Sequence, residues 1–435
     1  MHRYIYSCFH FIIFFLGFEL SAQFSLSPLL PLPAASSNGA ISTAEINGDK
    51  FIYYWAGIDS TLIYSGINQF GYRYNLANNS WESLPPIPDN VGKIAFSASR
   101  IGDIIYLVGG YSVAANGAEL SSNKVHRFSI LQNAFIEDAA DLPTPIDDHI
   151  QFVKNDSLIY VITGWSNTGN TGIVQVYNAN NNSWQLANNL PATGGYNAFG
   201  AAGICIGDTV YYFGGASDGL NFPATNRLRK GFIQPENPFQ IDWQSIVPNS
   251  NYKKYRAAGI NLNNKPCFIG GSSISYNYNG ISYANGASVS PSEDAFLLSD
   301  TGFTLIEILE FPMDIRALAE INTNEWVIVG GLISGPIATS NVWKLTYTSP
   351  NILSEVEYNI FVFPNPTSDN LHIRAAKRIK TVEFFQNGYS KLFAEMSAPS
   401  KMHDISVASL PSGIALIKVE FTDGTFNFKK LIIQH

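Results

Sequence analysis

The side chains best suited to binding or catalysis in this chain share one position relative to a recurring motif. Each stands 15 to 18 residues ahead of the glycine that closes a short apolar strand. Cationic groups, a histidine and a carboxylate at such positions would combine anion binding with proton transfer. The set is Lys93, Asp148, His149, Asn197, Tyr255, Arg256 and Arg316.

The motif that fixes this register is an apolar strand ending in glycine, as in Ile104 to Gly110. Its copies place closing glycines at positions 57, 110, 164, 215, 271 and 331. A period near fifty with one strand signal per repeat predicts a β-propeller, here with six blades. In such a ring the candidate residues precede the innermost strand of each blade and face one mouth of the central channel.

The first and last repeats are incomplete in complementary ways. Residues 24 to 33 resemble the fourth strand of later repeats, whereas the last repeat ends after its third strand near Tyr347. We therefore expect the N-terminal strand to complete the sixth blade and close the ring, which removes exposed strand edges.

Composition excludes several functional classes. The 435 residues are 46% hydrophobic and 14% charged, with a formal net charge of -8. No basic block is present, so we expect no nucleic-acid partner. No His pair has the spacing of metal ligands, and no phosphate loop or nucleophile elbow occurs. We expect neither a metal nor a cofactor.

The termini indicate processing and export. Residues 1–22 read as a signal peptide, with an apolar core from Cys8 to Phe18 and small residues before Gln23. No later segment is apolar enough to span a membrane. Cleavage would leave Cys205 and Cys267, which we expect to be buried and unpaired. Residues 349–359 read as a linker between two domains.

Residues 24–348 resemble the kelch repeat. The resemblance rests on the strand ending in Gly-Gly, a Tyr about seven residues before a Trp, and a following Leu-Pro, as in Tyr177, Trp184, Leu190 and Pro191. It implies an all-β fold, a six-bladed kelch-type β-propeller. Related kelch proteins often bind ligands at the rim of the channel.

Residues 360–435 resemble the C-terminal sorting domain (type A) of the type IX (Por) secretion system. The resemblance rests on Pro364-Asn365-Pro366-Thr367, on the Leu410 to Gly413 turn, and on a terminal strand with Lys429 and Lys430. It implies a small Ig-like β-sandwich that binds the secretion machinery. It also implies a secreted or cell-surface location in a Gram-negative, Bacteroidota-type bacterium.

Three functions remain open from the sequence. The first is a non-enzymatic module that binds a glycan or an extracellular protein through the seven candidate residues. The alternative is a sugar epimerase or mutarotase similar to N-acetylneuraminate epimerase. That resemblance implies catalytic roles for Arg256, Arg316, His149 and Asp148. The third is a structural adhesin in which the ring is only a scaffold.

Overall fold

The computed structural model describes residues 23–248, 251–299, 302–308, 311–348, 360–386, 389–423 and 426–435. The expected signal peptide and linker lie outside these residues. The chain forms two compact units, one of Ser21–Thr348 and one that contains Ser349–His435. Within the described ranges, no helix is both long and apolar enough to cross a membrane.

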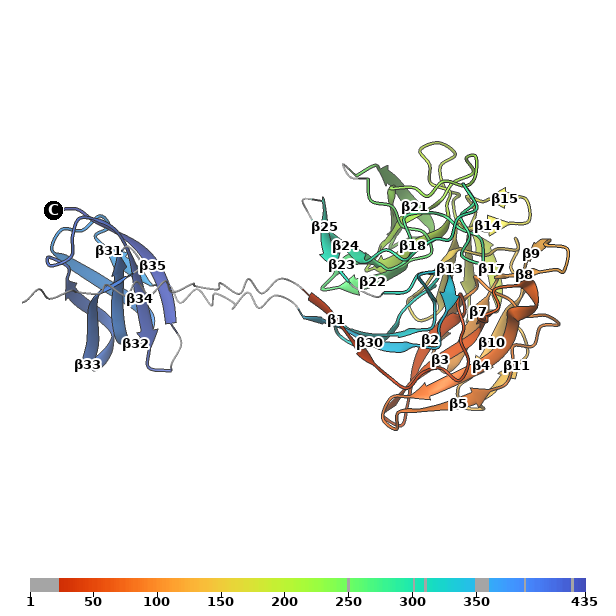
Figure 1. Ribbon diagram of the computed structural model, residues 1–435, viewed down its shortest axis with the longest axis horizontal. Coiled ribbons are helices and arrows are strands. Elements are labelled where there is room, and N and C mark those ends of the chain that lie inside the picture. Colours follow the sequence, from red (N-terminus) through yellow and green to blue (C-terminus); the bar gives the residue numbers. More distant parts are fainter. Residues whose placement is uncertain are drawn as a thin grey trace, which may run out of the picture. The chain divides into compact units, whose positions relative to one another are not determined.

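The first unit is a propeller of six four-stranded antiparallel sheets (Figure 1). Blade 1 contains β2 (Ala40–Ile46), β3 (Asp49–Ile58), β4 (Ile67–Asn75) and β5 (Ser80–Leu84). Blade 2 contains β6 (Ser97–Ile101), β7 (Ile104–Val108), β10 (Val125–Ser129) and β11 (Ala134–Ile136). Blade 3 contains β12 (Ile150–Lys154), β13 (Leu158–Ile162), β16 (Val174–Asn178) and β17 (Ser183–Leu186).

The remaining blades repeat the same order. Blade 4 contains β18 (Phe199–Ile206), β19 (Thr209–Ala216), β20 (Leu228–Gln234) and β21 (Asn237–Ile246). Blade 5 contains β22 (Ala258–Leu262), β23 (Lys265–Ile269), β24 (Asp294–Ser299) and β25 (Gly302–Glu307). Blade 6 contains β26 (Ala319–Asn322), β27 (Glu325–Val329), β30 (Val342–Thr348) and β1 (Gln23–Pro28).

Short elements follow the second strand of several blades. They are the 3-10 turn η1 (Tyr64–Gly66) and three two-stranded hairpins: β8 (Tyr111–Val113) with β9 (Glu119–Ser121), β14 (Trp165–Ser166) with β15 (Gly169–Asn170), and β28 (Leu332–Ile333) with β29 (Ile337–Ala338). Two of these hairpins contribute directly to the site described below.

The glycine pairs close the second strands by a left-handed turn. Gly109 has a φ of +69°, and a Cβ added there would lie 2.3 Å from the carbonyl oxygen of Ile146. The equivalent Ala56 and Thr163 adopt φ values of 55° and 50°. These conformations are unfavourable for residues with a side chain, so the turn is imposed by the packing of the blade.

The N-terminal strand closes the ring, which confirms the predicted propeller. β1 pairs with β30 from Gln23 opposite Thr348 to Pro28 opposite Trp343. Phe24 is buried and its ring lies 5.1 Å from that of Tyr347. The free edge of β30 is thereby covered by a strand that comes from the other end of the unit.

Replacement of Phe24 by alanine is expected to lower the free energy of unfolding by about 3 kcal/mol, the usual cost of truncating a buried phenylalanine. Urea unfolding followed by tryptophan fluorescence measures this change. The exposed Ser27 on the same strand supplies the control, because Ser27→Ala should change stability by less than about 0.5 kcal/mol. Equal effects of the two substitutions would show that β1 does not close the ring.

The second unit is all-β. It contains β31 (Phe361–Phe363), β32 (Asn370–Gln386), β33 (Tyr389–Ser406), β34 (Gly413–Phe421) and β35 (Phe426–Ile433). The sheet order is β31-β32-β34-β35, with β33 also paired to β32. Alternate residues of β34, namely Ala415, Ile417 and Val419, are buried in its core.

The two cysteines of the propeller are free, and they differ in exposure. Cys267 on β23 is fully buried, as expected. Cys205 on β18 is only partly buried, which corrects the expectation for that residue. It stands near the turn at Gly207, where the strand approaches solvent.

Candidate functional site

One position in each blade adopts a left-handed backbone just before the innermost strand or, in blade 4, at its second residue. The residues have φ between 47° and 64° and are Asn38, Ala95, Asp148, Gly200, Arg256 and Asp314. The backbone N–H of one donates to the carbonyl of another, as from Asp148 to Ala95 (3.0 Å), Gly200 to Asp148 (2.9 Å) and Arg256 to Gly200 (2.7 Å). Non-glycine residues in this region are strained, and these bonds hold them around the channel.

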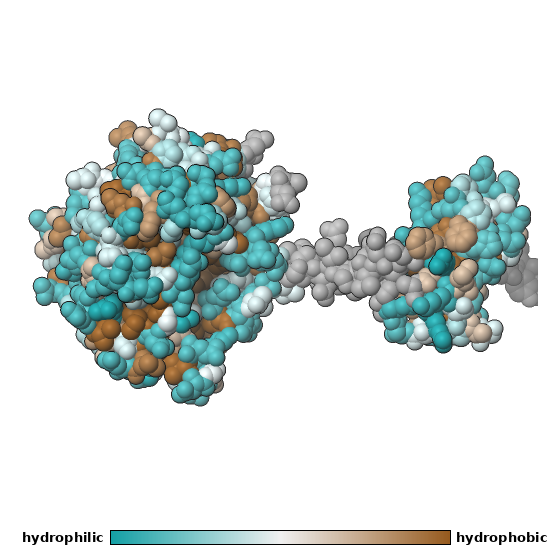
Figure 2. Space-filling view, turned by 180° about the vertical axis from the view of Figure 1, so that it is seen from behind, coloured by the Kyte–Doolittle hydropathy of each residue, from teal (hydrophilic) through white to brown (hydrophobic). Residues whose placement is uncertain are grey.

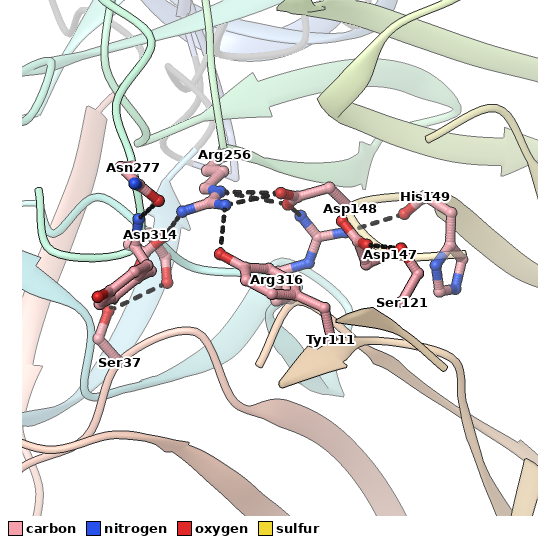
Figure 3. A network of polar contacts seen from close by, with 11 residues as sticks. Ser37, Tyr111, Ser121, Asp147, Asp148, His149, Arg256, Asn277, Asp314 and Arg316 are labelled. Atoms are coloured by element: carbon pink, nitrogen blue, oxygen red, sulfur yellow. Dashed lines mark hydrogen bonds and ion pairs between the residues drawn. The ribbon is translucent and has the colours of Figure 1, made fainter. Parts of the chain in front are cut away.

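Arg256 lies at the centre of a buried ionic network (Figure 3). Its Nη2 donates to Asp148 Oδ2 at 2.7 Å and its Nη1 to Asp314 Oδ1 at 3.2 Å. Nη2 also contacts the Tyr111 hydroxyl at 3.4 Å, and Nε donates to both oxygens of Asp148. The guanidinium is 1% exposed. Most of its donors are therefore already used within the protein.

Arg316 converges on the same carboxylate. Its Nη1 donates to Asp148 Oδ1 at 2.6 Å, and its Nη2 donates to the His149 carbonyl at 2.9 Å. Among the residues that the structure describes, its Nε has no hydrogen-bond partner. Although burial opposes ionisation of Asp148, the two arginines hold the pKa of this carboxyl below its usual value.

Two carboxyl groups near Asp148 have raised pKa values, in contrast to the lowered pKa of Asp148 itself. Burial, reinforced by the adjacent charge of Asp148, raises the pKa of Asp147 well above its usual value. The environment of Asp147 therefore favours its protonated form, and its Oδ2 accepts a hydrogen bond from Ser121 Oγ at 2.6 Å. Burial likewise raises the pKa of Asp314, which accepts from Ser37 Oγ at 2.8 Å.

A cavity of about 190 Å³ opens beside this network. Polar groups and aromatic rings share its lining, which comprises Tyr111, Glu119, Asp147, Asp148, Trp165, Phe199, Phe222, Arg256, Asn277 and Tyr283. The rings pack against one another: the ring centroid of Trp165 lies 5.3 Å from that of Phe199 and 5.4 Å from that of Phe222. An apolar wall with a few convergent polar groups is typical of a small-molecule site.

Residues from several blades build this cavity. Asp147 and Asp148 precede β12, and Arg256 precedes β22. Asp314 and Arg316, which precede β26, belong to the adjoining ionic network and do not line the cavity. The β8–β9 hairpin supplies Tyr111 and Glu119, and β14 supplies Trp165. On the propeller face seen in Figure 2, hydrophilic residues predominate and apolar residues form separate patches. The described residues contain no group of three or more His, Cys, Asp or Glu able to hold a metal.

Comparisons with known proteins account for both units. Residues 361–434 match the family described as the secretion system C-terminal sorting domain. A 152-residue segment is 25% identical to the kelch repeat and BTB domain-containing protein 2 of Ectromelia virus (strain Moscow), covering 34% of this chain and 24% of the viral protein. The solved structure of YjhT superposes with a TM-score of 0.60 and 17% identity, covering 74% of this chain and all of that one.

The chain is a kelch-type propeller followed by a type IX secretion sorting domain. The sorting domain directs export to the cell surface or the medium in Bacteroidota. The match to YjhT shows the fold of the kelch propeller alone, because the identity is low. The activity of the kelch propeller must be inferred from its own side chains.

The kelch propeller brings together part of the predicted residue set. Arg256, Arg316 and Asp148 meet in one network, and the buried ring of Tyr255 lies 5.3 Å from the Arg256 guanidinium. His149 belongs to the network only through its carbonyl, because its Nε2 contacts Gln151 at 3.0 Å.

Two predicted residues lie outside this network. Lys93 pairs with Asp89 at 2.5 Å and contacts His126. Asn197 lies beside Gly172 in blade 3. In both blades a neighbouring residue occupies the left-handed position, Ala95 two residues after Lys93 and Gly200 three residues after Asn197. Ala95 and Gly200 lie 15 residues before their closing glycines, the same spacing as Arg256, but neither has a polar side chain that would mark it as a candidate.

Sequence reasoning missed Asp147 and Asp314 as members of the site. Asp147 directly precedes the predicted Asp148, and Asp314 stands two residues before the predicted Arg316. Asp314 could have been found from its position, because both Asp314 and Asp148 lie shortly before the innermost strand of a blade. Trp165 and Tyr111 were not missed in this way, because aromatic residues in the loops that leave the second strands are expected on the same face as the candidate residues.

The buried imidazole of His149 makes stability depend on pH. Burial lowers the pKa of His149 to about 4, and the nearby Arg316 acts in the same direction. The unfolded chain, with a pKa of 6.5, therefore gains a proton first. This contribution to stability is complete above pH 6.5 and is lost as pH falls toward 4, a loss of about 3 kcal/mol.

The difference in unfolding free energy between wild type and His149→Gln isolates this effect from the neighbouring aspartates. We expect the difference to change by about 3 kcal/mol between pH 7 and pH 4, measured by urea unfolding. His435→Gln, at an exposed position, should show no such change. A pH-independent difference for His149→Gln would mean that the imidazole becomes protonated in the folded protein.

Proposed function

We propose that the exported propeller is a carbohydrate-binding module that takes a neutral sugar residue into the cavity beside Arg256. The observation that carries the proposal is that both arginines already bind Asp148. A carboxylated sugar would have to compete with this carboxylate for buried guanidinium groups. A neutral ligand with hydroxyl groups requires no such exchange.

The donors and acceptors of the cavity support a polyhydroxylated ligand. The raised pKa of Asp147 favours a protonated carboxyl that can donate to a hydroxyl, whereas the carboxylate of Asp148 and the exposed Glu119 can accept. Trp165 and Phe222 offer apolar surface for the C–H face of a sugar ring. The volume of about 190 Å³ is below the ~300–1,000 Å³ of sites for drug-sized ligands. This size suits one terminal residue of a glycan.

A glycan array probed with the labelled full chain tests this proposal. We expect binding to glycans with a neutral terminal sugar, and no binding to the same array by a Trp165→Ala variant. Binding confined to glycans that end in sialic or uronic acid would overturn the proposal. Binding that is unchanged by Trp165→Ala would place the glycan site elsewhere on the chain.

A second function, sugar mutarotation, is favoured by one specific observation. Asp147 and Asp148 face the same cavity with pKa values displaced in opposite directions, an arrangement typical of an acid and base pair. Mutarotation needs a proton donated to the ring oxygen and another removed from the anomeric hydroxyl. Polarimetry of freshly dissolved α-anomers supplies the test. A rate equal to that of buffer, or one unaffected by Asp147→Asn, would exclude this activity.

A further inference from the structure

A second polar cluster lies on the other side of the β8–β9 hairpin. The ammonium group of Lys93 contacts His126 Nε2 at 3.3 Å and Asp89 Oδ2 at 2.5 Å. His126 Nδ1 contacts Asp138 Oδ1 at 2.9 Å. Lys93 is 2% exposed and His126 is 1% exposed. His126 Nε2 also lies 3.1 Å from Asp89 Oδ1, so Lys93, His126 and two carboxylates form one contiguous cluster.

This cluster adjoins a cavity distinct from the sugar site. The cavity has a volume of about 260 Å³, and its lining includes Asp89, Lys93, Ser112, Ser121, Ser122 and Asn123. Apart from Val91 and Leu120, the lining side chains are polar or absent. The cavity is large enough for a small polar molecule. A molecule bound there would contact Lys93, the only lysine in the lining.

Blade 5 provides an internal comparison for Lys93. The carbonyl of Lys93 accepts from Gly57 N–H, and that of Lys254 accepts from Gly215 N–H, so the two lysines occupy equivalent positions. Both are buried, both pair with one aspartate, and both lie over a phenylalanine ring. Burial lowers the pKa of each lysine. Lys254, however, has no histidine among its partners in the described residues.

We propose that Lys93, His126 and Asp138 form a covalent carbonyl-binding site in which Lys93 condenses with an aldehyde or ketone, such as the open-chain form of a sugar. His126 Nε2 accepts a proton from Nζ, and the nitrogen lone pair forms a bond to the carbonyl carbon. The carbonyl oxygen then leaves as water with the two amine protons, and an imine remains. No oxidant or reductant is consumed.

The neighbouring carboxylates have separate roles in this step. Asp138 accepts a hydrogen bond from Nδ1 of His126, so that Nε2 carries the lone pair, and Nε2 lies 3.3 Å from Lys93 Nζ and 3.1 Å from Asp89 Oδ1. Although burial opposes its ionisation, His126 and Lys93 lower the pKa of Asp89 to about 2. Asp89 therefore stays ionised and stabilises the positive charge of a protonated imine. The site does not depend on sugar binding beside Arg256.

Reductive trapping tests the proposal. The full chain is incubated with glyceraldehyde and sodium cyanoborohydride, and modification of each lysine is followed by peptide mass mapping. We expect Lys93 to be modified at least about tenfold faster than Lys254, in line with assistance by a general base. In urea the two lysines should react at equal rates. A native rate for Lys93 no greater than that for Lys254 would overturn the proposal.

Two variants separate the relay from simple accessibility. His126→Asn and Asp138→Asn should each lower the rate at Lys93 about tenfold while leaving the rates at Lys254 and the exposed Lys265 unchanged. Asp138 is 38% exposed, so its substitution is compatible with folding even if that of His126 is not. An unchanged rate of labelling at Lys93 in folded Asp138→Asn protein would overturn the proposal, because the cluster would then be a structural ion pair alone.

Discussion

Replacement of Arg256 by alanine is expected to lower the free energy of unfolding of the propeller by about 3–5 kcal/mol, the cost of breaking a buried ion pair. The substitution leaves Asp148 with Arg316 alone and deprives Asp314 of its cationic partner. Both carboxyl groups are almost fully buried and cannot recover hydration. Urea unfolding of the full chain, followed at wavelengths sensitive to the propeller tryptophans, measures the loss.

Matched substitutions distinguish loss of the network from loss of charge. Arg256→Lys keeps the cation but cannot span two carboxylates, so an intermediate loss is expected. Arg73→Ala removes a partly exposed partner of Glu82 and should cost less than about 1 kcal/mol. If Arg256→Ala cost no more than Arg73→Ala, the network would not stabilise the contacts between blades 3, 5 and 6.

Replacement of the partly buried Trp165 by alanine is expected to weaken binding of a neutral sugar by about 30- to 100-fold, as at other aromatic anchors. The indole packs against Phe199 and Phe222 and lines the cavity, so its removal takes away the main stacking surface. Isothermal titration with the best glycan from the array measures the change.

Phe232→Ala provides the control for Trp165→Ala. Phe232 is an exposed aromatic residue on β20 that does not line the cavity. Its removal should leave the affinity unchanged. An equal loss in both variants would indicate a general effect on the fold, and no loss in either would move the sugar away from this cavity.

The architecture was accessible from the sequence because it repeats. Six copies of a glycine-closed strand fixed the number of blades, and the incomplete ends at Phe24 and Tyr347 predicted how the ring closes. The sorting domain was identified from local motifs at the C-terminus. These features depend on turn geometry and periodicity, which leave direct marks on residue type.

The composition of the site was less accessible. Counting from the glycines found Asp148 and Arg256, because in blades 3 and 5 the left-handed residue carries a charged side chain. It gave Lys93 and Asn197 instead of Ala95 and Gly200, because the six left-handed residues share a backbone conformation and no common side chain. The pairing of Arg316 with Asp148 spans 168 positions and depends on ring closure, which spacing alone does not reveal.

The most direct test of neutral-sugar recognition compares one sugar in two charge states. The full chain is titrated with a methyl glycoside and with the methyl glycoside of the corresponding uronic acid, which differs only in a carboxylate at the sixth carbon. We predict that the neutral glycoside binds at least about tenfold more tightly, a difference of ~1.4 kcal/mol. Tighter binding of the uronic acid would contradict the account, because it would mean that Arg256 or Arg316 is free to receive an anion.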